Sequence, residues 1–116
     1  MRYQVIAVDF DGTIAEEDWP GIGKLIPKAK EIINRFAAQG GIVILNTCRV
    51  GVYLDAAKQF LKENGITVHY FNENSAEKLA CWPDTRKIGA DMYIDDRNPG
   101  GPNWDLVEKL LFGDEG

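Results

Sequence analysis

The sequence predicts an α/β fold, a Rossmann-like three-layer sandwich with a parallel sheet of about four or five strands and no cap domain. Two observations predict it. Short apolar segments alternate along the chain with segments whose apolar residues recur at helical spacing. The strand segments are apolar throughout, as in strands that are buried on both faces of a sheet. Helices on both faces, joined by right-handed crossovers, are the usual way to cover such strands.

The first half of the chain contains two predicted strands and two predicted helices. Residues 3–8 form a short, apolar and partly β-branched segment, which favours a buried strand. Residues 26–39 carry apolar side chains at helical spacing. A second buried strand is predicted at residues 42–45, within "GGIVILNTCR". Apolar residues between 54 and 61 then mark a second amphipathic helix, which is expected to stop at Asn64-Gly65.

The second half completes the alternation. "ITVHYF" predicts a third strand, "ADMYIDD" a fourth, and "NWDLVEKLLF" a closing helix. The chain has no internal repeat and no low-complexity linker. We therefore expect one domain that spans residues 1–116.

Composition limits the classes of function. The net charge of -5 argues against a protein that coats nucleic acid or binds an anionic membrane. The two cysteines, Cys48 and Cys81, form no CxxC pair, which suits a reducing compartment and argues against structural zinc. No apolar run approaches the roughly 18 residues of a membrane span, and the first residues lack the apolar length of a signal peptide. We expect a cytoplasmic protein with no membrane partner.

Polar residues follow three of the predicted strands: Asp9 and Asp11, then Asn46, Thr47 and Arg49, then Asp95 and Asp96. The carboxyl ends of parallel strands meet at one edge of the sheet, where open α/β folds bind their ligands. Four carboxylates in a small volume oppose each other's ionisation, so the cluster needs a cation or a chemical task. Mg²⁺ fits best because it takes oxygen ligands and bridges carboxylates to a substrate phosphate, whereas zinc prefers nitrogen or sulfur.

Phosphoryl transfer is a reaction that uses such a site. One aspartate can attack phosphorus and form an aspartyl-phosphate. A second aspartate can give a proton to the leaving group and then take a proton from the attacking water. The cation and a lysine can hold the equatorial oxygens.

"VDFDGT" sets two aspartates after a predicted buried strand, and "ILNTCR" sets a threonine at the end of the next one. These segments resemble the first two motifs of the haloacid dehalogenase-like phosphohydrolases, DxDGT after a buried strand and a Thr or Ser at the end of a strand. Lys87 in "TRKIGAD" is placed like the third-motif lysine, and "MYIDDRN" resembles the acidic fourth motif. The motifs occur in the family's order, and the resemblance covers roughly residues 3–112.

The resemblance implies a nucleophile and a proton carrier. Asp9 would be the nucleophile and a magnesium ligand. Asp11 would be the general acid/base and would also bind the metal through its backbone carbonyl. Family phosphatases carry aspartate at this second position and the dehalogenase branch lacks it, so phosphoryl chemistry is favoured over carbon–halogen cleavage.

The remaining motif residues would bind phosphate and metal. Thr47 would donate a hydrogen bond to the phosphoryl oxygens, and Lys87 would neutralise their charge. Asp95 and Asp96 would complete the metal site directly or through water. The third motif has two nearby alternatives to Lys87, namely Lys78 and Arg86.

Two further residues are assigned to substrate binding, Asn46 and Arg49. For Arg49 two interpretations stay open: it binds the substrate phosphate bidentately, or it pairs with a motif carboxylate.

The resemblance also predicts an open site. The interval between residues 13 and 25, "TIAEEDWPGIGKL", has room for a flap and no cap domain. Such a site accepts a phosphorylated small molecule or a phosphorylated macromolecular end, or is covered by homo-oligomerisation.

The leading hypothesis is a magnesium-dependent phosphatase. One alternative is a catalytically idle or regulatory phosphate-binding protein of the same fold. A phospho-accepting receiver domain is disfavoured, because receivers place the accepting aspartate after the third strand, where this chain reads "HYFNENS".

Overall fold

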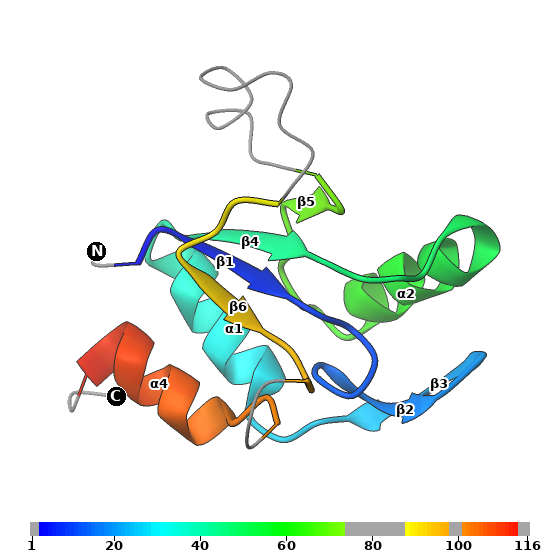
Figure 1. Cartoon of the computed structure of the whole chain (residues 1–116), viewed down its shortest axis with the longest axis horizontal. Coiled ribbons are helices and arrows are strands. Elements are labelled where there is room, and N and C mark those ends of the chain that lie inside the picture. The colour runs from blue at the N-terminus through cyan, green and yellow to red at the C-terminus, as the bar shows by residue number, and fades with distance from the viewer. Residues whose placement is uncertain (1–2, 74–87, 98–100, 114–116) are drawn as a thin grey trace.

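A parallel sheet of four strands forms the centre of the protein (Figure 1). The computed structural model describes residues 3–73, 88–97 and 101–113. The strands lie in the order β5-β4-β1-β6. Their bounds are Val5–Val8 for β1, Ile42–Leu45 for β4, Tyr70–Phe71 for β5 and Met92–Ile94 for β6. The predicted α/β class is confirmed, and so is a parallel sheet of four strands.

β1 lies between β4 and β6 and pairs with both in parallel. Backbone hydrogen bonds continue past the strand ends. The Asp9 N–H donates to the Ile94 carbonyl at 2.9 Å, and the Asn46 N–H donates to the Val8 carbonyl at 2.9 Å. The residues that follow β1, β4 and β6 therefore reach the same edge of the sheet.

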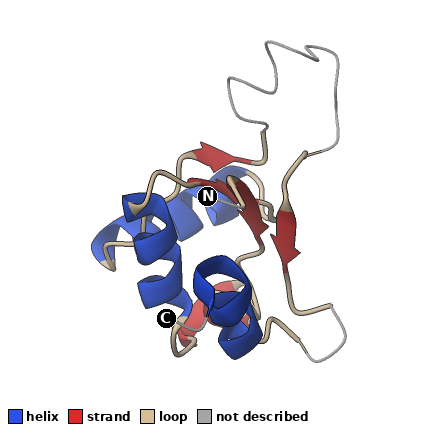
Figure 2. Ribbon diagram, turned by 90° about the vertical axis from the view of Figure 1, so that its left-hand side faces the viewer, coloured by secondary structure: helices blue, strands red, loops and turns tan. Residues whose placement is uncertain are grey.

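The described helices, α1 (Ala29–Ala38), α2 (Gly51–Glu63) and α4 (Trp104–Phe112), pack on one face of this sheet (Figure 2). Alternate strand residues, such as Ile6 and Val8, share a buried cluster with apolar residues of all three helices. The described residues do not include a second helical layer on the other face of the sheet, so that part of the prediction is not tested; residues 74–87 lie outside the described ranges.

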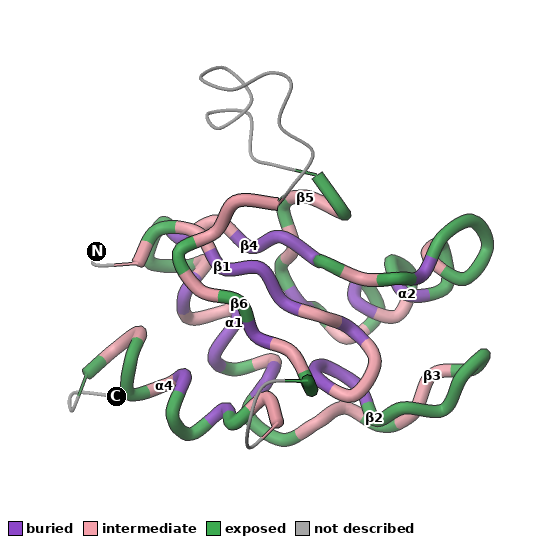
Figure 3. Tube along the Cα trace, in the orientation of Figure 1, coloured by how far each residue is buried: buried purple, intermediate pink, exposed green. Residues whose placement is uncertain are grey.

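The predicted flap is a hairpin. β2 (Ala15–Asp18) and β3 (Gly21–Leu25) pair antiparallel. Most residues of β2 are exposed, in contrast to the buried strands of the central sheet (Figure 3). The Ile26 N–H donates to the Ile14 carbonyl at 2.8 Å. The prediction that α1 begins at residue 26 is therefore wrong: that backbone group bonds to the base of the hairpin, and the helix begins at Ala29.

The third strand is shorter than "ITVHYF" predicts. The Thr67 N–H donates to Asn34 Oδ1 at 2.9 Å, so the start of the segment bonds to α1. His69 bonds twice to Val43: its N–H donates to the Val43 carbonyl, and its Nδ1 accepts from the Val43 N–H, both at 2.9 Å. Regular strand pairing with β4 is therefore limited to Tyr70–Phe71, which form β5.

The ends of the other helices agree with their sequence signals. α2 ends at Glu63 and is followed by Asn64 and Gly65, and Gly65 has a φ of +67°. α4 begins after Asn103, whose Oδ1 accepts from the Leu106 N–H at 3.2 Å. Across the described ranges, no helix has the length and apolar character that crossing a membrane requires.

Candidate active site

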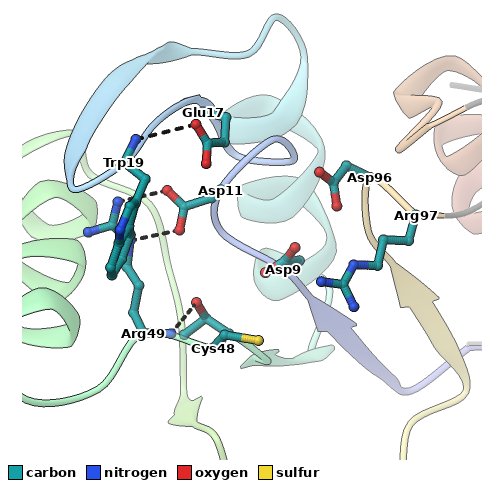
Figure 4. A pocket seen from close by; sticks show the side chains of 9 residues that line it. Asp9, Asp11, Glu17, Trp19, Cys48, Arg49, Asp96 and Arg97 are labelled. Carbon is teal, nitrogen blue, oxygen red and sulfur yellow. Dashed lines mark hydrogen bonds and ion pairs between the residues drawn. The ribbon is translucent and has the colours of Figure 1, made fainter.

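A cavity of about 350 Å³ opens at the carboxyl edge of the sheet (Figure 4). Five of the predicted site residues line it: Asp9, Asp11, Thr47, Arg49 and Asp96. Two others, Asn46 and Asp95, line an adjoining hollow of about 180 Å³ that also borders on Asp9 and Thr47. The structure thus brings together every predicted site residue that it describes. Lys87 and its alternatives Lys78 and Arg86 lie outside the described residues.

Asp9 lies at the centre of this edge because it directly follows the central strand. Its Oδ1 accepts a hydrogen bond from the Phe10 N–H at 2.8 Å, and within the described ranges its Oδ2 has no hydrogen bond. Burial raises the pKa of Asp9 from 3.8 to about 6, the Phe10 hydrogen bond opposes this, and the charges of Asp96, Asp11 and Asp95 add to the rise. Ionising Asp9 is therefore costly until a cation compensates its charge.

The raised pKa of Asp9 predicts a loss of stability with rising pH. Between pH 3.8 and about 6 the folded protein binds this proton more tightly than the unfolded chain does, so the free energy of unfolding falls as pH rises through that window. Asp9→Asn should remove this contribution. In a chelator, the variant should gain stability relative to wild type as pH rises from 4 to 7, measured by urea unfolding. A stability difference that is constant across this range would contradict the assignment.

Gly12 lets the loop after β1 and the loop after β6 approach each other beside the cavity. Its φ is +77°, and a Cβ built on it would lie 2.5 Å from Asp96 Oδ2. The Asp96 carboxylate therefore lies directly against the loop that carries Asp9 and Asp11. Glycine suits this position because it adopts a positive φ without strain and has no Cβ that would collide with Asp96.

Gly12→Ala should weaken Mg²⁺ binding. The substitution forces an unfavourable backbone conformation, at about 1–2 kcal/mol, and also displaces the Asp96 carboxylate. Gly40→Ala is the matched control, because Gly40 has a φ of +93° and a Cβ added to it would meet nothing within 4 Å. The stabilisation by Mg²⁺ in a thermal melt should shrink in Gly12→Ala and persist in Gly40→Ala. Equal Mg²⁺ responses in the two variants would contradict the role given to Asp96.

The loop after β4 is held by a residue that sequence reasoning missed. The Thr47 N–H donates to Asn72 Oδ1 at 2.8 Å, and Asn72 follows β5 with a φ of +54°. Thr47 Oγ1 accepts from the Arg49 N–H at 3.2 Å, which leaves the hydroxyl proton free to be donated. The asparagines in "FNEN" were the only sequence signal for this contact.

Arg49 pairs with Asp11. Its Nε donates to Asp11 Oδ2 and its Nη2 donates to Asp11 Oδ1, each at 2.7 Å, and the Arg49 side chain is only 1% exposed. The hydrogen bond with Asp11 raises the pKa of the guanidinium, against the effect of burial. Of the two interpretations left open by the sequence, the structure shows the pair with the motif carboxylate. The fork that would bind a substrate phosphate is occupied by Asp11.

Arg97 is a cationic residue of the site that the sequence reasoning did not identify. It is exposed, lines both the cavity and the adjoining hollow, and extends toward Asp9 from the loop after β6 (Figure 4). Its N–H donates to Asp95 Oδ1 at 2.8 Å. A basic residue directly after the acidic pair in "IDDRN" was the available signal.

The donor set fits Mg²⁺. Within the described part of the chain, no three acidic, histidine or cysteine side chains converge into a group that could hold a metal by themselves. Mg²⁺ is usually held by one or two carboxylates, with waters and substrate phosphate completing its coordination. Asp9 and Asp96 can supply such carboxylates, and their mutual repulsion, which contributes to the raised pKa of Asp9, is the kind that a cation relieves.

One solved structure matches most of this chain. It is described as the structure of a conserved protein coded by a locus from Bacteroides thetaiotaomicron, and it is 37% identical in sequence. The match covers 92% of this chain and 88% of the other, with a TM-score of 0.81. No protein-family model and no curated protein match the chain.

Proposed function

We propose that this chain, which belongs to the same family as the conserved Bacteroides thetaiotaomicron protein, is a magnesium-dependent phosphatase. The reaction would proceed through an aspartyl-phosphate. The observation that carries the proposal is the state of Asp9. It ends the central strand in a cavity of about 350 Å³, its Oδ2 lacks a partner among the described residues, and its pKa is raised to about 6.

The fold assignment belongs to the same proposal. We infer a Rossmann-like three-layer sandwich without a cap domain, of the haloacid dehalogenase-like type. The strand order β5-β4-β1-β6 supports it, because it places the carboxyl ends of β1, β4 and β6 beside one another. The four motif segments of the sequence support it as well.

In the first half of the reaction, Asp9 Oδ2 attacks phosphorus. A bond forms between Oδ2 and phosphorus, the bond from phosphorus to the leaving oxygen breaks, and the leaving oxygen keeps the electron pair. Asp11, in the role implied by the resemblance, supplies the proton to that oxygen. The Phe10 N–H holds Oδ1 and so fixes the direction of the Asp9 carboxylate.

In the second half, water attacks phosphorus and the bond to Asp9 Oδ2 breaks. Asp11 takes the proton from water, and inorganic phosphate leaves. We assign the binding of phosphoryl oxygens to the Thr47 hydroxyl and the Arg97 guanidinium, because both residues line the cavity and the adjoining hollow. Lys87 is proposed for the same task. Mg²⁺ would be held by Asp9, by the Asp11 carbonyl and by either Asp96 or Asp95. When bound, it would stabilise the negative charge of the phosphoryl group.

The direct test is hydrolysis of 4-nitrophenyl phosphate and of a panel of phosphorylated metabolites. We expect hydrolysis with Mg²⁺ and its loss in chelator, with recovery when Mg²⁺ is returned. Beryllium fluoride, which mimics the phosphorylated carboxylate, should stabilise the protein only when Mg²⁺ is present. Turnover that is unaffected by chelator, or no turnover on any substrate, would contradict the proposal.

A second candidate is a catalytically idle or regulatory phosphate-binding protein. The Asp11–Arg49 pair favours it, because both Asp11 oxygens accept hydrogen bonds at 2.7 Å from a buried guanidinium. This candidate predicts Mg²⁺-dependent binding of beryllium fluoride or phosphate without hydrolysis. The same experiment thus separates the two candidates.

A further inference from the structure

Arg49 ties the turn of the hairpin to the loop after β1. Besides the pair with Asp11, its Nη2 donates to the Gly21 carbonyl at 2.7 Å and its Nη1 donates to the Pro20 carbonyl at 3.3 Å. Pro20 and Gly21 lie where β2 passes into β3. One buried side chain therefore bonds at the same time to the site and to the tip of the hairpin.

Aromatic rings enclose the same guanidinium. Its central carbon lies 4.9 Å from the ring centroid of Trp19 and 5.3 Å from that of Phe10. Trp19 in turn packs on Tyr53 of α2, with ring centroids 4.8 Å apart. Nη1 also donates to the Tyr53 carbonyl at 3.4 Å. Arg49 thus joins the hairpin to α2 as well as to Asp11.

Among the described residues, the outer end of the hairpin is held mainly by Arg49 and by the packing of Trp19 on Tyr53. Three of the four β2 residues are exposed, and Trp19 is 52% exposed. A two-stranded hairpin is marginally stable by itself in water, so its position depends on what it packs against. Arg49, at 1% exposure, supplies buried hydrogen bonds to the turn of the hairpin.

The position of the hairpin defines one side of the catalytic cavity. Glu17 and Trp19 both line it, and the Trp19 N–H donates to Glu17 Oε2 at 3.3 Å (Figure 4). A volume of about 350 Å³ is near the lower end for ligand sites, which span roughly 300–1,000 Å³. With the hairpin fixed, the cavity itself holds a phosphate and a small attached group, and the hairpin wall at Glu17 and Trp19 limits bulk on that side.

We propose that Arg49 is a positioning residue that clamps the β2–β3 hairpin as a fixed wall of the cavity, so that the site selects compact phosphorylated small molecules over phosphorylated macromolecular ends. The inference rests on the proposed phosphatase activity. It assigns to Arg49 a task other than binding the substrate phosphate, and to Trp19 a task in specificity.

The test compares two substrates with the same leaving chemistry and different bulk: phenyl phosphate and a phosphotyrosine peptide. We expect wild type to prefer phenyl phosphate by on the order of 100-fold in kcat/KM, the range that a shaped pocket can supply. Trp19→Ala and Arg49→Lys should each lower this preference roughly tenfold. The preference is a ratio within one sample, so it does not change with the fraction of folded protein. A purely structural role of Arg49 would leave it unchanged.

Arg49→Lys keeps the positive charge and loses the planar fork that bonds to Asp11 and the hairpin turn together. Trp19→Ala changes an exposed residue, so the specificity test stands even if Arg49 variants fail to fold. Equal rates on the two substrates in wild type, or a ratio unchanged in both variants, would overturn the proposal.

A second measurement tests the clamp without catalysis. Acrylamide quenching of Trp19 fluorescence, taken as the difference from a Trp19→Phe background, should increase in Arg49→Lys. Unchanged quenching would overturn the clamp even if the phosphatase activity is found. If no phosphate ester is hydrolysed but quenching increases in Arg49→Lys, the clamp is supported and the proposed phosphatase activity is wrong.

Discussion

Asp9→Asn is expected to reduce magnesium-dependent phosphatase activity by on the order of 10⁴-fold or more, as removal of a nucleophile does in other hydrolases. An amide cannot displace the leaving group as the Asp9 carboxylate can. Its oxygen can still accept the hydrogen bond that the Phe10 N–H donates at 2.8 Å. The variant should therefore fold and lose the chemistry. The measurement is kcat/KM on 4-nitrophenyl phosphate.

Asp55→Asn is the matched control for this prediction. It removes the same charge from an exposed position on α2. Its activity should equal that of wild type. An Asp9→Asn protein that retains near wild-type turnover would refute the assignment of the nucleophile.

Asp11→Asn should reduce kcat roughly 10²–10⁴-fold, the usual contribution of acid/base assistance. An amide neither gives nor takes the proton. With 4-nitrophenyl phosphate the leaving group needs little protonation, so we expect the loss mainly in the hydrolysis of the aspartyl-phosphate. The signature is a burst of nitrophenol of about one equivalent followed by slow turnover.

Asp11→Asn also weakens the pair with Arg49, whose N–H groups lie 2.7 Å from both carboxylate oxygens. Breaking a buried pair costs about 3–5 kcal/mol. Because the Asp11 side chain is 20% exposed, we expect the free energy of unfolding to fall by less than this amount. Activity must therefore be compared where the variant is folded. A decrease below tenfold under those conditions would show that Asp11 does not move the proton.

The sheet could be predicted because its strands are defined by local pattern. Apolar runs marked β1 and β4, and the Asn-Gly pair marked the end of α2. The start of α1 was predicted at residue 26 and lies at Ala29, because the Ile26 N–H bonds to the Ile14 carbonyl. A bond between segments that pack only after folding has no signal in the periodicity of one segment.

The same distinction applies to the candidate site. The acidic residues could be placed at one edge because parallel strands put their carboxyl ends together. The partner of Arg49 could not be chosen, since a guanidinium fork suits a phosphate and a carboxylate equally well. The choice depends on the hairpin, which brings the Pro20 and Gly21 carbonyls to Arg49.

The most direct test of the account is to identify the covalent intermediate. Asp11→Asn protein is mixed with 4-nitrophenyl phosphate and Mg²⁺, quenched in acid during the burst, digested and mapped by mass spectrometry. We predict one phosphoryl group on the peptide that contains Asp9, and none in chelator or in the Asp9→Asn/Asp11→Asn double variant. Phosphate on another residue, or turnover with no phosphorylated protein in the quenched burst, would contradict the central claim.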